Sequence, residues 1–160
     1  MTENSPVIVR WIPVFIVFGA GLFILALAVS AALIPELRFL HLFQAIIYVA
    51  IIVLSQRNSP WGFGFGIFVP VVWNCLNLFV THLIEAGAAQ LWLFLRTGHV
   101  SRPDTLMVMI GGVAHFILIA ACLVGFLRLR PDKKKWSRFI AGGFLSLAYF
   151  ALIIVILAPR

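Results

Sequence analysis

Five long apolar runs, separated by short polar loops, constrain this chain more than any other feature. The runs cover about residues 11–34, 39–55, 63–86, 105–127 and 139–158. A helix that crosses a hydrocarbon core of roughly 30 Å needs about 20 predominantly apolar residues, which matches the length of these runs. We therefore expect an all-α integral membrane protein, folded as a five-transmembrane-helix bundle with a single membrane domain over residues 1–160.

Composition favours the same class. Apolar residues make up 63% of the chain and charged residues 11%, with a mean hydropathy of +1.12. In soluble domains about 45–50% of the residues are apolar and about 25% are charged. The net charge of +7 comes from residues in short loops beside apolar runs, so we expect membrane topology rather than nucleic acid to account for it. Cys75 and Cys122 lie inside apolar runs and predict no disulfide framework.

The third run is longer than one upright span. It stays largely apolar as far as residue 95, and a continuous helix over 63–95 would be roughly 50 Å long. Such a helix either tilts strongly and projects from the bilayer, or it bends near Gly87 and continues as an interfacial segment that contains Trp92.

A basic loop over residues 128–138 orients the predicted bundle. It holds half of the twelve Lys and Arg residues of the chain: Arg128, Arg130, Lys133, Lys134, Lys135 and Arg138. Because basic loops beside membrane spans stay in the cytoplasm, five crossings place the N-terminus in the cytoplasm and the C-terminus outside. Arg10 and Arg57 then join the cytoplasmic set, and four basic residues lie outside: Arg38, Arg96, Arg102 and Arg160. The bias agrees with five crossings, and we expect a multi-pass protein of a bacterial inner membrane.

Polar side chains recur at helical spacing inside the third run. Asn74, Asn77, Thr81 and Glu85 are three, four and four residues apart, which places them on one helix face as a polar stripe, with His82 beside it. The second run repeats this pattern with His41, Gln44 and Tyr48, and the fourth run contains His115. Ionisable groups inside a bilayer are costly, so they are candidates for function.

Four interpretations of these side chains compete. His82 and His115 on facing spans are candidate axial ligands of haem b, which would make the chain an electron-transfer module. His41, His82, Glu85 and His115 are candidate metal ligands, although the second Glu and His pair of di-iron bundles is missing. The stripe from Asn74 to Glu85 is a candidate proton or small-solute pathway. The best-supported interpretation is that these groups form hydrogen bonds between helices.

No complete catalytic motif is present, and no catalytic residue is assigned. We expect a small accessory, assembly or structural membrane component without enzyme activity; the alternatives are a proton or small-solute transporter and a haem b or metal-binding module. Expected partners are the lipid bilayer, anionic lipid headgroups at Lys133, Lys134 and Lys135, and either a larger membrane complex or a second copy of the chain.

Overall fold

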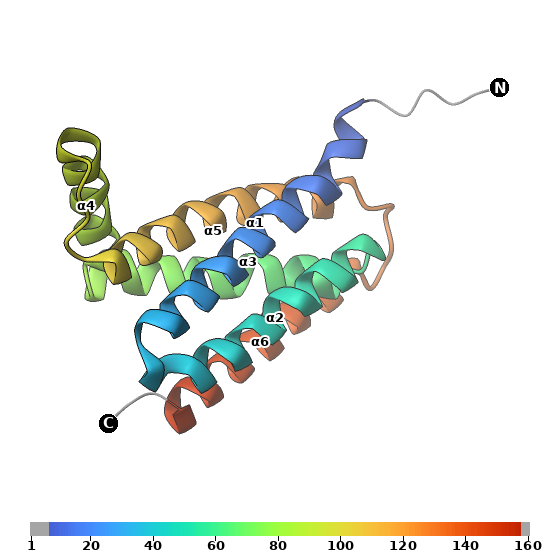
Figure 1. Ribbon diagram of the computed structural model, residues 1–160. Helices are drawn as coiled ribbons and strands as arrows, with labels where there is room; N and C mark the ends of the chain where they lie inside the picture. Colours follow the sequence, from blue (N-terminus) through green and yellow to red (C-terminus); the bar gives the residue numbers. More distant parts are fainter. Residues whose placement is uncertain (1–6, 158–160) are drawn as a thin grey trace.

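The computed structural model describes residues 7–157, and this part of the chain consists of helices joined by short turns and loops, without strands (Figure 1). The helices are α1 Val7–Leu33, the 3-10 turn η1 Pro35–Leu37, α2 Arg38–Gln56, α3 Pro60–Cys75, the π-helical segment η2 Leu76–Val80, α4 Leu83–Thr97, α5 Pro103–Arg128 and α6 Lys135–Leu157. Arg160, which the charge count places outside the membrane, lies beyond the described residues.

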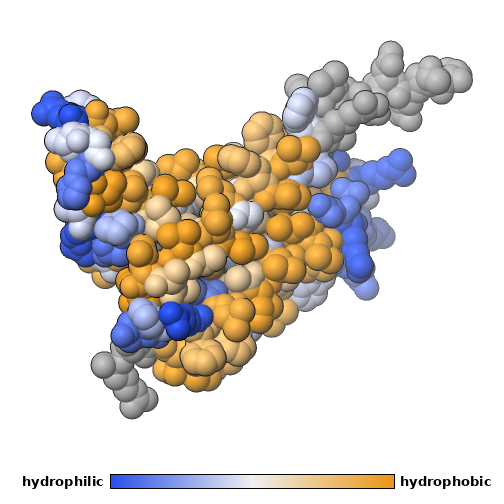
Figure 2. Space-filling model, viewed as in Figure 1, coloured by the Kyte–Doolittle hydropathy of each residue, from blue (hydrophilic) through white to orange (hydrophobic). Residues whose placement is uncertain are grey.

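Within residues 7–157, five helical segments are long and apolar enough to cross a membrane. They are Trp11–Leu33, Pro35–Gln56, Pro60–Val80, Pro103–Arg128 and Lys135–Leu157. Their exposed faces carry large apolar side chains, and hydrophilic residues gather at the two ends of the bundle with a hydrophobic band between them (Figure 2). The predicted all-helical fold with five helices of membrane-spanning length is confirmed.

The central helix of the bundle is α3, which packs against α2, α5 and α6. Helix α1 covers the other side of the core by packing against α2 and α5. The α5–α6 loop lies at one end of the bundle, which we call the basic-loop end. At the opposite end α1 finishes, α5 begins and α4 projects from the bundle (Figure 1); we call this the α4 end.

The third apolar run is broken at Thr81 and His82. The backbone amide of Thr81 donates to the carbonyl oxygen of Leu76 at 2.9 Å, which closes a π-helical turn. His82 then adopts a left-handed conformation with φ of 54°, and α4 starts in a new direction. The long run is therefore a span followed by a separate helix, and the break precedes Gly87 by five residues.

Local hydrogen bonding accounts for the position of this break. The Asn77 side chain donates to the carbonyl oxygen of Trp73 at 2.9 Å, and the Thr81 hydroxyl donates to Asn77 Oδ1 at 3.2 Å. Such side-chain bonds compete with the regular helical pattern. Gly87 has a different role, since a Cβ there would collide with the carbonyl oxygen of Thr105. The absence of a side chain at Gly87 lets α4 lie directly on α5.

Candidate functional site

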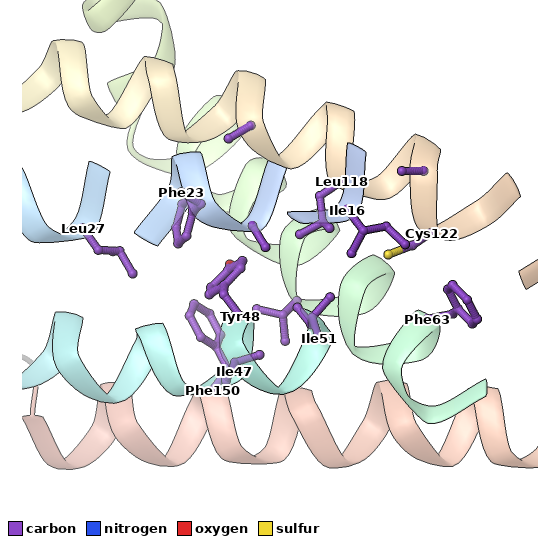
Figure 3. Close-up of a cluster of buried hydrophobic side chains, with 14 of the residues drawn as sticks. Ile16, Phe23, Leu27, Ile47, Tyr48, Ile51, Phe63, Leu118, Cys122 and Phe150 are labelled. Atoms are coloured by element: carbon purple, nitrogen blue, oxygen red, sulfur yellow. The ribbon is translucent and has the colours of Figure 1, made fainter. Parts of the chain in front are cut away.

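Four helices place a cluster of aromatic and polar side chains around His115, which is fully buried. Phe23 from α1 stacks on the imidazole with ring centroids 4.0 Å apart, and Trp73 from α3 meets it edge-on at 4.8 Å. Tyr48 from α2 lies parallel to the imidazole at 5.5 Å. Phe23 and Tyr48 point toward one another across the core (Figure 3). We call these residues, together with Asn74, the His115 cluster.

Both ring nitrogens of His115 have protein partners. Nδ1 lies 3.1 Å from Asn74 Oδ1, and Nε2 lies 2.7 Å from the Tyr48 hydroxyl. An amide oxygen accepts and never donates, so the imidazole proton is on Nδ1 and Nε2 accepts from the Tyr48 hydroxyl. The three side chains form one directed chain of hydrogen bonds from α2 through α5 to α3. This chain fixes the orientation of the ring in the middle of the bundle.

A cavity of about 230 Å³ lies beside the His115 cluster, toward the α4 end. Phe23 and Trp73 line both the cavity and the cluster. The other walls are mostly aliphatic, with polar groups supplied by Ser30, His41, Gln44, Asn77, Asp104 and Thr105. A largely apolar cavity with a few polar groups is the usual form of a small-molecule site. We call it the α4-end cavity.

Two buried polar atoms at this place have no partner among the described residues. His41 Nδ1 and Asn74 Nδ2 are buried without a hydrogen bond. Buried polar atoms of folded proteins are nearly always hydrogen-bonded to protein, water or ligand. The carboxylate of Asp104, in contrast, is paired with Arg102 at 2.9 Å. The cavity wall therefore offers the free His41 nitrogen, with Asn74 Nδ2 in the adjoining His115 cluster, but no unpaired carboxylate.

A surface groove between α1 and α2 adjoins the cavity. Its lining is almost entirely apolar, and Leu27 and His41 line the groove as well as the cavity. Arg38 is at its rim and donates to the carbonyl oxygen of Ala31 at 3.2 Å. The His41 side chain thus stands between an internal cavity and the apolar outer surface of the bundle.

Toward the basic-loop end buried polar side chains are few; Ser55 is one, and its hydroxyl donates to the carbonyl oxygen of Ile51 on its own helix at 2.6 Å. There the core is packed with apolar side chains, including Ile16, Ile51, Phe63, Leu118 and Cys122, all at most 2% exposed. Figure 3 shows these side chains following Phe23 and Tyr48 along the interior of the bundle. The cavity therefore ends at the His115 cluster, and the other half of the bundle is closed.

The structure does not bring the candidate haem ligands together as a free pair. His82 is on the break before α4, with 62% of its side chain exposed and its Nδ1 3.4 Å from Glu85 Oε2. His115 is buried, and both its nitrogens are engaged. Among the described residues, no group of three or more His, Cys, Asp and Glu side chains could hold a metal ion. The set of His41, His82, Glu85 and His115 is therefore not assembled around one point.

The polar stripe of the third run is divided by the same break. Asn74 joins the His115 cluster, and Asn77 lines the α4-end cavity. Thr81 is exposed at the end of η2, and Glu85 is exposed on α4. The first half of the stripe faces the interior and the second half lies on the surface.

Several residues of the site were not singled out from the sequence, namely Phe23, Ser30, Trp73, Asp104 and Thr105. Trp73 carried a usable signal, because tryptophans of membrane proteins concentrate at the interfaces and this one lies in mid-run. Phe23 carries no such signal, since Phe15 and Phe18 lie in the same run. Ser30 carries one, because it is the only hydroxyl-bearing, amide or charged side chain in the first run.

Comparison with known proteins adds no assignment, because no protein family, curated protein or solved structure matches the chain. The function is therefore argued from the geometry of the site.

Proposed function

We propose that this chain is a five-span accessory protein of a bacterial inner membrane that binds a small neutral amphiphilic molecule in the α4-end cavity. The observation that carries the proposal is a cavity with an aromatic wall, placed beside buried hydrogen-bonding groups that have no protein partner. A binding role accords with the closed apolar half of the bundle better than conduction of a solute from one side to the other.

The charge distribution supports an orientation with the basic-loop end in the cytoplasm. Eight basic residues fall on that side and four on the other when the chain crosses five times, in line with the positive-inside rule. Trp11, Trp61 and Trp136, near the starts of α1, α3 and α6, then mark the cytoplasmic interface. In this orientation the α4-end cavity is in the outer half of the bilayer.

Size and lining define the class of ligand. A cavity of roughly 150 Å³ holds one benzene ring, so 230 Å³ accommodates one ring or two fused rings. Phe23 and Trp73 offer aromatic surfaces for such a ring. Gln44 and His41 offer hydrogen bonds to a hydroxyl or carbonyl group. A neutral molecule fits because Asp104 is already paired.

Replacing Ser30 with phenylalanine should weaken binding of such a molecule by at least about tenfold, since the new ring would occupy the cavity. The probe is 2-naphthol, an uncharged bicyclic molecule with one hydroxyl group. Equilibrium dialysis of the full chain in mild detergent gives the dissociation constant for wild type and Ser30→Phe.

The matched control is Val29→Phe. Val29 is the next residue of α1, is 36% exposed and does not line the cavity, so the same ring is added to the outer surface. We expect wild-type binding in this variant. Equal affinity in Ser30→Phe and Val29→Phe, or no saturable binding by wild type, would refute the proposed binding function.

A further inference from the structure

A second cavity, of about 460 Å³, lies at the basic-loop end, opposite the α4-end cavity. Asn58, in the turn between α2 and α3, and Pro60, the first residue of α3, form one wall. The end of α5, the α5–α6 loop and the first turn of α6 form the rest, with Arg128, Leu129, Arg130, Asp132, Lys135 and Arg138. Four cationic side chains thus surround one space together with a single carboxylate. We call it the basic cavity.

The internal contacts leave much of this positive charge unbalanced. Asp132 Oδ2 accepts from Arg138 at 3.2 Å, and its other oxygen accepts from the backbone amide of Lys134. Lys135 Nζ donates to the carbonyl oxygen of Leu129 at 3.1 Å and lies 4.7 Å from the centre of the Phe126 ring. Within residues 7–157, Arg128 and Arg130 have no acidic partner. Their guanidinium groups are therefore free for an anion.

We propose that the basic cavity binds the phosphodiester headgroup of an anionic phospholipid. Guanidinium groups bind phosphate oxygens through paired hydrogen bonds, and basic pockets between spans on the cytoplasmic side bind anionic headgroups. The cavity is lined by the ends of spans, and its neighbour Trp136 is 59% exposed, as expected of a side chain at a membrane interface. A lipid held there keeps its acyl chains against the hydrophobic band of Figure 2.

This placement differs from the sequence prediction for headgroup contacts. Lys135 lines the basic cavity, whereas Lys133 and Lys134 do not. Arg128, the last residue of α5, and Arg130, in the α5–α6 loop, take their place. Some basic residues of the loop therefore line the basic cavity, and others contribute positive charge alone. Substitutions in the first group can be compared with substitutions in the second.

The test measures lipid binding by the full chain in mild detergent with native mass spectrometry. Phosphatidylglycerol and phosphatidylcholine with the same acyl chains are compared, so that only the headgroup differs. Wild type should retain phosphatidylglycerol in preference to phosphatidylcholine. Arg128→Gln/Arg130→Gln should weaken that binding by roughly 30-fold, because each variant side chain loses its charge-assisted hydrogen bonds to the phosphodiester inside the cavity, about a fivefold factor each. The affinity of Arg128→Lys/Arg130→Lys for phosphatidylglycerol should lie between those of wild type and the glutamine variant, since the charge remains but the paired hydrogen bonding is lost.

Lys133→Gln/Lys134→Gln is the control, because it removes the same charge from the same loop outside the cavity. We expect less than about a threefold change there. An equal loss in both double variants, or no preference of wild type for phosphatidylglycerol, overturns the proposal. Displacement of the lipid by millimolar inorganic phosphate would show a site for a soluble anion instead.

The inference rests on membrane residence, as the proposed function does, and not on the α4-end cavity. Flotation of each variant with phosphatidylcholine vesicles measures membrane residence separately. Wild-type protein that floats but does not discriminate between headgroups counts against the basic cavity alone.

Discussion

Replacing Gly64 with alanine should lower the melting temperature of the purified protein by roughly 10 °C, the equivalent of about 3 kcal/mol. A Cβ at this position would collide with the carbonyl oxygen of Phe139 and would lie 2.9 Å from the backbone amide nitrogen of Gly143. Both obstacles are backbone atoms of α6, so no side-chain rotation relieves them. Helix α3 would have to move away from α6, and the central contact of the bundle would loosen.

Gly21→Ala is the control for this substitution. Gly21 is also within a helix, but a Cβ there would have no atom within 4 Å. We expect its melting temperature to equal or slightly exceed that of wild type, because alanine favours the helix. Thermal unfolding followed by circular dichroism in one detergent compares the two variants. If Gly64→Ala melts at the temperature of Gly21→Ala, the packing of α3 on α6 is described incorrectly.

Tyr48→Phe should destabilise the bundle by about 2 kcal/mol, although it removes a single oxygen atom. The Tyr48 hydroxyl is 2.7 Å from His115 Nε2, and the imidazole is fully buried between Phe23, Trp73 and Tyr48. Without the hydroxyl, Nε2 would be an unpaired buried acceptor. The free energy of unfolding in denaturant, compared with that of wild type, measures this cost.

The other tyrosine provides the comparison. Tyr149 donates to the carbonyl oxygen of Phe43 at 3.1 Å in an exposed contact between α6 and α2. The same change, Tyr149→Phe, should cost less than about 0.6 kcal/mol, the average for hydrogen bonds between membrane helices. Similar costs for the two variants would mean that the His115 cluster is not the closed network described above.

Much of the fold could be predicted from the sequence because each apolar run is a local property. The lengths of the runs define five helices of spanning length, and the observed boundaries at Leu33, Gln56, Arg128 and Leu157 lie within a few residues of the expected ones. The break before α4 is harder to predict from the sequence. It depends on competing side-chain hydrogen bonds of Asn77 and Thr81, whereas Gly87, the expected position of a bend, serves a contact between α4 and α5.

The site could be predicted only in part. Helical spacing placed Asn74 on one polar face and Tyr48 on another, and His115 was evident as a polar residue in an apolar run. The three side chains meet only because of the way α2, α3 and α5 pack against one another. The spacing of residues along a single helix gives no information about this packing. The stripe was extended to Glu85 on the assumption of a continuous helix, and the break at His82 removes Glu85 from the interior.

The central claim, a ligand cavity in the outer half of a five-span bundle, is tested most directly by cysteine labelling. Cys75→Ser/Cys122→Ala removes the native thiols, and single cysteines are then introduced by Ser30→Cys and Ser137→Cys. Ser30 lines the α4-end cavity, and Ser137 is exposed near the start of α6 at the basic-loop end. A charged, membrane-impermeant thiol reagent is applied to right-side-out and to inverted membrane vesicles.

We expect the cysteine at position 30 to react in right-side-out vesicles and the one at position 137 in inverted vesicles. 2-Naphthol should slow the reaction at position 30 alone, because that cysteine shares the cavity with the probe. Reaction at position 30 from the cytoplasmic side, or a rate that 2-naphthol leaves unchanged at saturating concentration, would contradict the account.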